Sequence, residues 1–292
     1  MDELHFTRLK LMARSPAHYA AYQDLTEPTA AMRLGTAVHA LALGGDLIRY
    51  DGERKGNAWQ SFKALVDGAD HYVFDAPHRG NAWKAAKEEA AGRVIVTSAD
   101  VELAEHAAEV QRRRRAEGRY KAAIVTTAEY DQAQRCAEVV RADRIGAQLL
   151  QGDTEVPLRW SVLDRPCAGQ LDVCGESGVT DLKTTTKSEP GWFERHALGM
   201  VYHAQLAWYA EGARQNQRPA EELHIVAVEI KPPFAVTGFR LTDRAVEEGE
   251  KMIRLWMERL AGCEAADEWP AYVQSIVPLD VERFELTFEE VA

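Results

Sequence analysis

Residues 153–183 read DTEVPLRWSVLDRPCAGQLDVCGESGVTDLK and decide the fold. Three short runs of partly alternating polar and apolar residues, at 153–162, 167–174 and 178–183, are separated by turn-forming residues at 164–166 and 175–178. Alternation with a period of two is typical of β-strands, and clusters of Gly, Pro, Asp and Ser end them. This stretch therefore predicts a three-stranded antiparallel meander.

Helical periodicity surrounds the meander on both sides. We expect helices at 5–23, 28–44, from Ser98 or Asp100 to about 116, and at 129–140. After the meander we expect a helix at 190–214, strands near 222–230 and 234–240, and a helix at 242–262. This order predicts an α/β fold with a mixed central sheet flanked by helices and a helical N-terminal region. The tetrapeptide GNAW, at 56–59 and 80–83, predicts two helix starts capped by Asn.

Composition limits the class of protein. The 292 residues are 46% hydrophobic, enough for one large core. The four cysteines form no C-x-x-C pair, so zinc and iron–sulfur clusters are not expected. The N-terminal residues lack the layout of a signal peptide, and no apolar run approaches the roughly 20 residues that span a bilayer. We therefore expect a cytoplasmic protein without a membrane partner.

The net charge of −11 argues at first against a nucleic-acid partner, because phosphate binding usually draws on a basic surface. A metal-dependent site concentrates carboxylates, however, and a local basic track can offset the acidity of the whole chain. One candidate track consists of Arg112, Arg113, Arg114, Arg115, Arg119 and Lys121. A solvated helix face explains the same residues equally well.

Two acidic residues and a lysine occupy neighbouring strands of the meander. Asp181 and Lys183 are two apart and face the same side of a strand, while Leu182 faces the core. Hairpin pairing can bring Asp172 beside them. Two converging carboxylates repel unless a cation lies between them, and hard oxygen ligands suit Mg²⁺ or Mn²⁺. The lysine could position or deprotonate an attacking water. A surface hairpin with an Asp–Lys pair is the alternative, since D-x-K is common by chance.

The flanking residues give this constellation a family resemblance. Five features occur in one order: Gly35-x-x-x-His39, Glu155, Gly169-x-Leu171-Asp172, Val179-Thr180-Asp181-Leu182-Lys183-Thr184 and Gln205-x-x-x-Tyr209. The set resembles the RecB-like branch of PD-(D/E)XK nucleases, most of all the RecE (exonuclease VIII) type of phage and prophage exonuclease, and more distantly phage lambda exonuclease. The resemblance is dense over 150–215 and thin over 9–44, and no motif in 45–145 contributes to it. The resemblance implies a restriction-endonuclease-like core.

The resemblance also implies roles for these residues. The implied metal ligands are His39, Asp172, Asp181 and the backbone carbonyl of Leu182. Lys183 would orient the attacking water, and Glu155 would assist metal or water binding. His39 could instead be an ordinary buried histidine among apolar neighbours.

Further residues are implied to act in catalysis, namely Gln205 and Tyr209, or to contact DNA. Gln205 and Tyr209 are four apart on one helix face, so they can reach one phosphate or the lysine side of the site, although an ordinary amphipathic helix has the same spacing. The segment Ser15-Pro16-Ala17-His18-Tyr19 resembles the Ser-plus-Tyr segment that lies near the DNA path in RecB-like nucleases. The expected DNA contacts are Arg14, Ser15, Arg33 and Tyr209, though either arginine could be an ordinary surface residue.

As a whole, the resemblance implies a Mg²⁺-dependent exonuclease, with Mn²⁺ as a substitute, that degrades linear double-stranded DNA from 5′ to 3′ and leaves 3′ single strands. A single-strand annealing protein and a homo-oligomeric ring, a trimer or tetramer, are the implied partners. We expect one nuclease domain over 1–292, with N-terminal helices at 1–44, a mostly helical insertion at 45–145, a catalytic core at 146–265 and a tail at 266–292.

Other functions remain open at this point. The same catalytic residues serve endonucleases and exonucleases of either polarity. A non-catalytic DNA-binding or scaffold protein could keep the nuclease fold, although such proteins usually lose one of Asp172, Asp181 and Lys183. An unrelated metal hydrolase acting on a small substrate would need a closed pocket.

Overall fold

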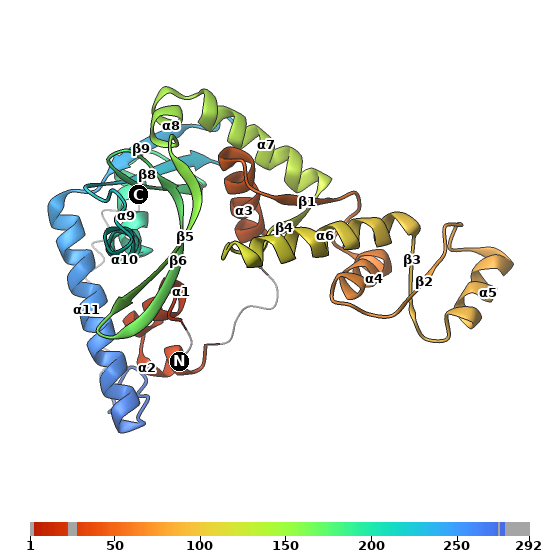
Figure 1. Ribbon diagram of the computed structural model, residues 1–292, viewed down its shortest axis with the longest axis horizontal. Helices are drawn as coiled ribbons and strands as arrows, with labels where there is room; N and C mark the ends of the chain where they lie inside the picture. Colours follow the sequence, from red (N-terminus) through yellow and green to blue (C-terminus); the bar gives the residue numbers. More distant parts are fainter. Residues whose placement is uncertain (1–2, 23–27, 274, 278–292) are drawn as a thin grey trace, which may run out of the picture.

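A five-stranded mixed sheet forms the centre of the computed structural model, which describes residues 3–22, 28–273 and 275–277 (Figure 1). Its strands lie in the order β5 (Asp153–Val162), β6 (Arg165–Cys174), β7 (Gly178–Thr185), β8 (Glu222–Glu229) and β9 (Val236–Arg240). The pairs β5/β6, β6/β7 and β8/β9 are antiparallel, and β7/β8 is parallel. The predicted α/β fold and the predicted meander are confirmed.

The hairpin between β5 and β6 is tighter than expected. Leu163 and Asp164 both have positive φ, 48° and 60°, and Val162 pairs directly with Arg165. Two central residues of positive φ match the right-handed twist of the flanking strands. The second strand therefore begins two residues before the predicted start at Cys167.

Helices cover both faces of the sheet. A large apolar cluster packs the four strands from β5 through β8 against α9 (Pro190–Gly199), α10 (Tyr202–Gln215) and α11 (Asp243–Ala266). A second cluster packs β7 and β8 against α3 (Ala30–Leu43) and α7 (Thr127–Ala142), which is followed by α8 (Arg144–Leu149). The helix predicted at 190–214 is two helices, because Val201 adopts a left-handed conformation, with φ 54°, between them.

The N-terminal segment also departs from the prediction of one helix over 5–23. It forms α1 (Phe6–Leu9), the 3₁₀ helix η1 (Lys10–Ala13) and α2 (Pro16–Ala20). Proline lacks an N–H and disfavours helical backbone in the residue before it. Ser15 is accordingly extended, with φ −173° and ψ 159°, and its side chain caps α2 by accepting from the His18 N–H. The end of the predicted helix, at residue 23, lies outside the described residues.

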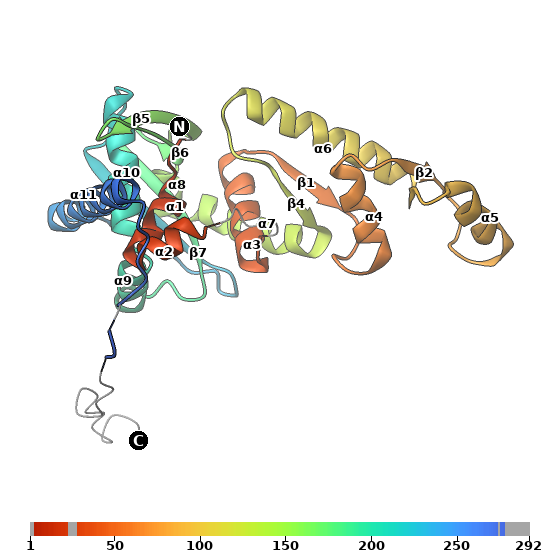
Figure 2. The ribbon, with the colours of Figure 1, turned by 90° about the horizontal axis from the view of Figure 1, so that it is seen from below.

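A long excursion of the chain leaves the body of the molecule between residues 51 and 122, here called the arm (Figures 1 and 2). Its base is the parallel pair β1 (Leu47–Tyr50) and β4 (Ala123–Thr126). Along it lie α4 (Gly56–Val66), β2 (His71–Val73), α5 (Gly80–Ala90), β3 (Val94–Val96) and α6 (Ser98–Ala116), with β2 and β3 paired in parallel. The region expected to be mostly helical thus also holds four short strands.

Both GNAW segments begin helices, as predicted, but Asn does not cap them. The N-cap residues are Lys55 and Arg79, and neither helix has a side-chain cap. Gly56 and Gly80 instead open the helices with φ 74° and 77°, a conformation that glycine adopts at little cost. The prediction of an Asn cap is therefore wrong.

The cap of α6 is a capping box between Thr97 and Asp100 rather than Ser98. All four cysteines are buried and free. Within the described ranges, no helix is long and apolar enough to cross a membrane.

Candidate active site

The strands β6 and β7 separate where the two acidic residues lie. Their pairing covers Cys174 with Val179 and Val173 with Thr180, and then stops. One further step of this register would place Asp172 opposite Asp181. Instead, the Leu182 N–H donates to Asp172 Oδ2 at 2.8 Å. The Asp172 carboxylate thus takes the place of a backbone acceptor and holds open a fork between the two strands.

Asp181 and Lys183 continue along β7 on one side of the fork. Asp181 is 4% exposed, and Lys183 Nζ lies 2.5 Å from its Oδ2. Oδ2 is buried, and its partner among the described residues is this ammonium. The Lys183 ammonium also lies 4.8 Å from the ring centroid of Tyr202. Leu182 is fully buried and packs in the cluster with α3, as predicted.

The motif Gly35-x-x-x-His39 brings a histidine to the fork. A Cβ at Gly35 would lie 3.3 Å from Thr184 Oγ1, so the missing side chain lets α3 pack closely on β7. One turn later, His39 Nδ1 lies 3.2 Å from Asp172 Oδ1. The structure therefore joins His39 and Asp172, which are 133 residues apart in the sequence.

Burial and charge shift the pKa of each group at the fork. Burial lowers the pKa of His39, but Asp172 outweighs it and leaves the value raised. Burial raises the pKa of Asp172, but His39, Lys183 and the Leu182 N–H leave it lowered. For Asp181, burial outweighs the neighbouring ammonium and leaves the pKa raised. Burial lowers the pKa of Lys183, but Asp181 and Asp172 raise it above its usual value. Lys183 is therefore a cation at neutral pH.

The donor set at the fork fits a hard divalent ion. Asp172 and Asp181 supply carboxylate oxygens, and His39 an imidazole. The Leu182 N–H points into the fork, and the N–H and C=O of a strand residue point the same way, so its carbonyl faces the fork as well. In the described ranges, no three His, Cys, Asp or Glu side chains lie close enough together, as they are positioned here, to bind one metal ion. An ion at the fork would take the place of the Lys183 ammonium beside the buried Asp181 Oδ2.

Glu155 lies on β5 opposite Asp172 of β6, but its carboxylate is bound by an arginine of the arm. The pairs Thr154 with Val173 and Val156 with Leu171 flank it, while Glu155 itself is unpaired, with φ 50°. It is 8% exposed, and Arg114 of α6 donates to both of its oxygens at 2.9 Å. Its assistance to a metal or water stays a prediction.

Gln205 and Tyr209 share one face of α10, as their spacing predicts. Gln205 Nε2 donates to the Tyr209 hydroxyl at 3.5 Å. The Tyr209 ring lies against Gly169, where a Cβ would come within 2.7 Å of its Cε1 atom. Burial raises the pKa of Tyr209 well above its ordinary value, so its hydroxyl remains a proton donor.

The residues expected to contact DNA near the N-terminus have protein partners. Arg14 donates to the Tyr272 hydroxyl at 3.4 Å. Ser15 is fully buried and lies 2.6 Å from His18 Nδ1. Arg33 pairs with Glu129 at 2.8 Å. Their contacts with DNA stay predictions.

Sequence reasoning missed Lys10 and Tyr202. Burial and then the charge of Lys183 lower the pKa of Lys10, which makes no ion pair with another described residue. In a segment expected to be one helix, Lys10 resembled any surface lysine. Tyr202, beneath the Lys183 ammonium, lies at the unpredicted start of α10. A cavity of about 690 Å³ lined by Arg33, Arg54 and Glu129 does not include Asp172 or Asp181.

Comparison with known proteins places this geometry in a class. The fold is that of the PD-(D/E)XK proteins, a restriction-endonuclease-like arrangement. The chain belongs to the family of PDDEXK-like domains of unknown function (DUF3799), whose model matches residues 5–277. A crystal structure described as a "putative exonuclease" from Eubacterium rectale is similar, with 12% sequence identity, a TM-score of 0.51, and coverage of 98% of this chain and 94% of that one. At this identity, the similarity concerns the fold. A search of curated proteins found no match.

Proposed function

We propose that this protein is a divalent-metal-dependent exonuclease that degrades linear double-stranded DNA from 5′ to 3′ and leaves 3′ single strands. The observation that carries the proposal is the fork, where His39 contacts Asp172 and the Lys183 ammonium contacts the buried Oδ2 of Asp181. The family and the structural neighbour support a nuclease-like fold around it.

The chain's own residues would divide the work. Asp172 is fixed by His39 and by the Leu182 N–H, so its orientation is set before any ligand arrives. Lys183 is protonated, which favours donating hydrogen bonds to a water or phosphate oxygen over removing a proton. The protonated Tyr209 hydroxyl could donate to a phosphate from the neighbouring helix.

A bound Mg²⁺ or Mn²⁺ would supply Lewis-acid polarisation of the phosphate and lower the pKa of a water. His39, Asp172, Asp181 and the Leu182 carbonyl are the groups that would hold it. Binding would require Lys183 to release Asp181 Oδ2, which lies 2.5 Å from its ammonium.

The finer parts of the proposal are supported by the resemblance to RecE-type exonucleases. That resemblance favours attack from a 5′ end, a ring of three or four subunits and an annealing protein that receives the 3′ strand. The phosphate-directed residues at the fork favour slight sequence preference, because backbone contacts do not read bases.

Digestion of end-labelled DNA tests the proposal. Linear duplexes labelled at 5′ or 3′ ends, and a closed circle, are incubated with Mg²⁺ and then with EDTA. We expect early release of the 5′ label, an intact circle and no digestion in EDTA. Asp181→Ala should lower the rate on the order of 10²-fold or more.

Arg144→Ala, at an exposed position on α8, is the control and should digest DNA like the wild type. Equal rates for Asp181→Ala and wild type would refute the site. Cutting of the circle, or earlier release of the 3′ label, would instead refute the proposed polarity and exonuclease action.

A binding measurement separates the metal from catalysis. Mn²⁺ should raise the melting temperature of the wild type by mass action, and this shift should disappear in Asp172→Ala. A protein that digests no DNA but keeps the Mn²⁺ shift would favour the non-catalytic alternative.

A further inference from the structure

A pocket of about 250 Å³ lies at the C-terminal end of α6, outside the fork. Three separate segments line it: the N-terminal residues, the end of α6 with the loop after it, and the strands β5 and β6. Its cations are Arg115, Arg119, Lys121 and Arg159, against the single carboxylate of Glu3. This local excess of positive charge contrasts with the net charge of −11 for the whole chain.

The cations of the pocket differ in their availability. Arg159 is paired with Glu3 at 2.5 Å, and Arg119 lies 3.5 Å from carboxylate oxygens of Glu117 and Glu155. Arg115 and Lys121 are exposed, and neither side chain has an ion pair or hydrogen bond with another described residue. Two cations are therefore free to bind a polyanion.

Tyr120 adds an aromatic surface between these cations. It is 44% exposed, and its ring centroid lies 6.1 Å from that of His5. Its backbone is fixed from both sides, since Tyr120 N–H donates to Gln170 Oε1 at 2.8 Å and Arg114 Nε donates to Tyr120 O at 2.5 Å. Gln170 precedes Asp172 by two residues in β6, so the ring is held at a set position relative to the fork.

We infer that this pocket binds a single-stranded stretch of nucleic acid beside the cleavage site. Arg115 and Lys121 bind its phosphates, and a base stacks on Tyr120. Cations combined with an exposed aromatic ring are the usual means of binding single strands without sequence preference. A duplex would keep its bases paired and would leave the ring unused. The inference rests on the proposed nuclease function and names the part of the substrate that the arm contacts.

Binding of a fluorescein-labelled 12-nucleotide single strand, followed by fluorescence anisotropy in EDTA, tests the inference. Tyr120→Ala should weaken binding about tenfold, within the range for one base stacked on an aromatic side chain. Tyr120→Phe should bind like the wild type, because the ring remains. Arg115→Ala/Lys121→Ala should reduce the slope of log K against log salt by about 1.4, the value for two lost phosphate contacts on a single strand.

The charge-matched control is Lys84→Ala/Arg144→Ala, which removes one lysine and one arginine at exposed positions on α5 and α8. It should leave affinity and salt slope unchanged. Wild-type affinity in both Tyr120→Ala and the pocket double variant would overturn the inference, and so would equal losses for single strand and duplex. Because EDTA prevents cleavage, the binding measurement is independent of the digestion assay. Undiminished digestion by Asp181→Ala would refute the catalytic site and would not affect the measured binding of the single strand.

Discussion

Removal of the Arg114 guanidinium should destabilise the protein far more than removal of its neighbour Arg113. The Arg114 side chain is 3% exposed and donates to both oxygens of the buried Glu155, whereas the Arg113 side chain is 53% exposed and pairs with Asp46. Breaking a buried pair leaves an uncompensated charge and costs roughly 3–5 kcal/mol. Arg119, 3.5 Å from Glu155, compensates in part, so we expect about 3 kcal/mol for Arg114→Ala.

Urea unfolding and thermal melts followed by circular dichroism measure the difference. The Arg114→Ala loss corresponds to a fall in melting temperature of about 6–12 °C, and Arg113→Ala should cost about 1 kcal/mol or less. Adding Glu155→Gln to Arg114→Ala should restore part of the loss, because the amide carries no charge. Equal losses for the two arginine variants, or no recovery in the double variant, would show that Glu155 is not held by a buried ion pair.

Three further predictions concern acid stability, packing and catalysis. Burial raises the pKa of Glu129, but hydrogen bonds from the α7 N-terminus and from two arginines lower it to about 2. The stabilisation from the Glu129 carboxylate is therefore fully present above its unfolded pKa near 4.5 and is lost as pH falls towards 2. In chemical unfolding at pH 7, Glu129→Gln should lower the free energy of unfolding by about 1–2 kcal/mol, and this difference from the wild type should disappear as pH falls through that range. Gly212→Ala would place a Cβ 2.8 Å from Trp160 Cε3 and should cost about 1–3 kcal/mol in thermal melts, whereas Gly262→Ala, with open space around it, should not destabilise. Lys183→Met should lower kcat on the order of 10²-fold with the fold intact by circular dichroism; a near-wild-type rate would remove the lysine from the reaction.

The parts of the fold predicted from sequence were those with local signals. The meander alternates with a period of two, and its turns contain Gly, Pro and Asp, so its three strands and the shared face of Asp181 and Lys183 could be predicted. Apolar spacing predicts a single N-terminal helix through Ser15, but Pro16 interrupts it. The strands of the arm, three or four residues each, are too short to show any period.

The long-range parts of the candidate site had no such signal. His39 and Asp172 were associated only through the order of motifs in a family, and their 3.2 Å contact depends on the packing of α3 against β7. The Glu155 and Arg114 pair joins a strand to the arm across 41 residues, and neither residue type predicts the other. Tyr120 lay in a region without any motif, next to arginines that fitted a solvated helix face equally well.

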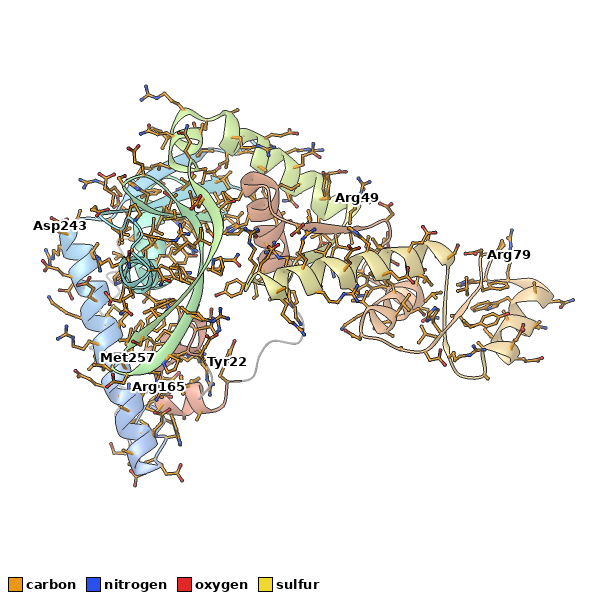
Figure 3. The ribbon with its side chains drawn as sticks, in the orientation of Figure 1. Tyr22, Arg49, Arg79, Arg165, Asp243 and Met257 are labelled. Carbon is orange, nitrogen blue, oxygen red and sulfur yellow. The ribbon has the colours of Figure 1, made fainter. Side chains whose placement is uncertain are left out.

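Helix α6 sets a fixed spacing along the arm. Its 19 residues make a rod of about 28 Å, as long as about eight stacked base pairs. Its first residue follows β3, and α5 at the far end of the arm lies beyond it (Figure 1), on the side where Figure 3 labels Arg79. Its other end carries Arg114 and Arg115 beside the central sheet. Because a continuous helix changes its length little, a ligand that contacts both α5 and the central sheet must be longer than this rod.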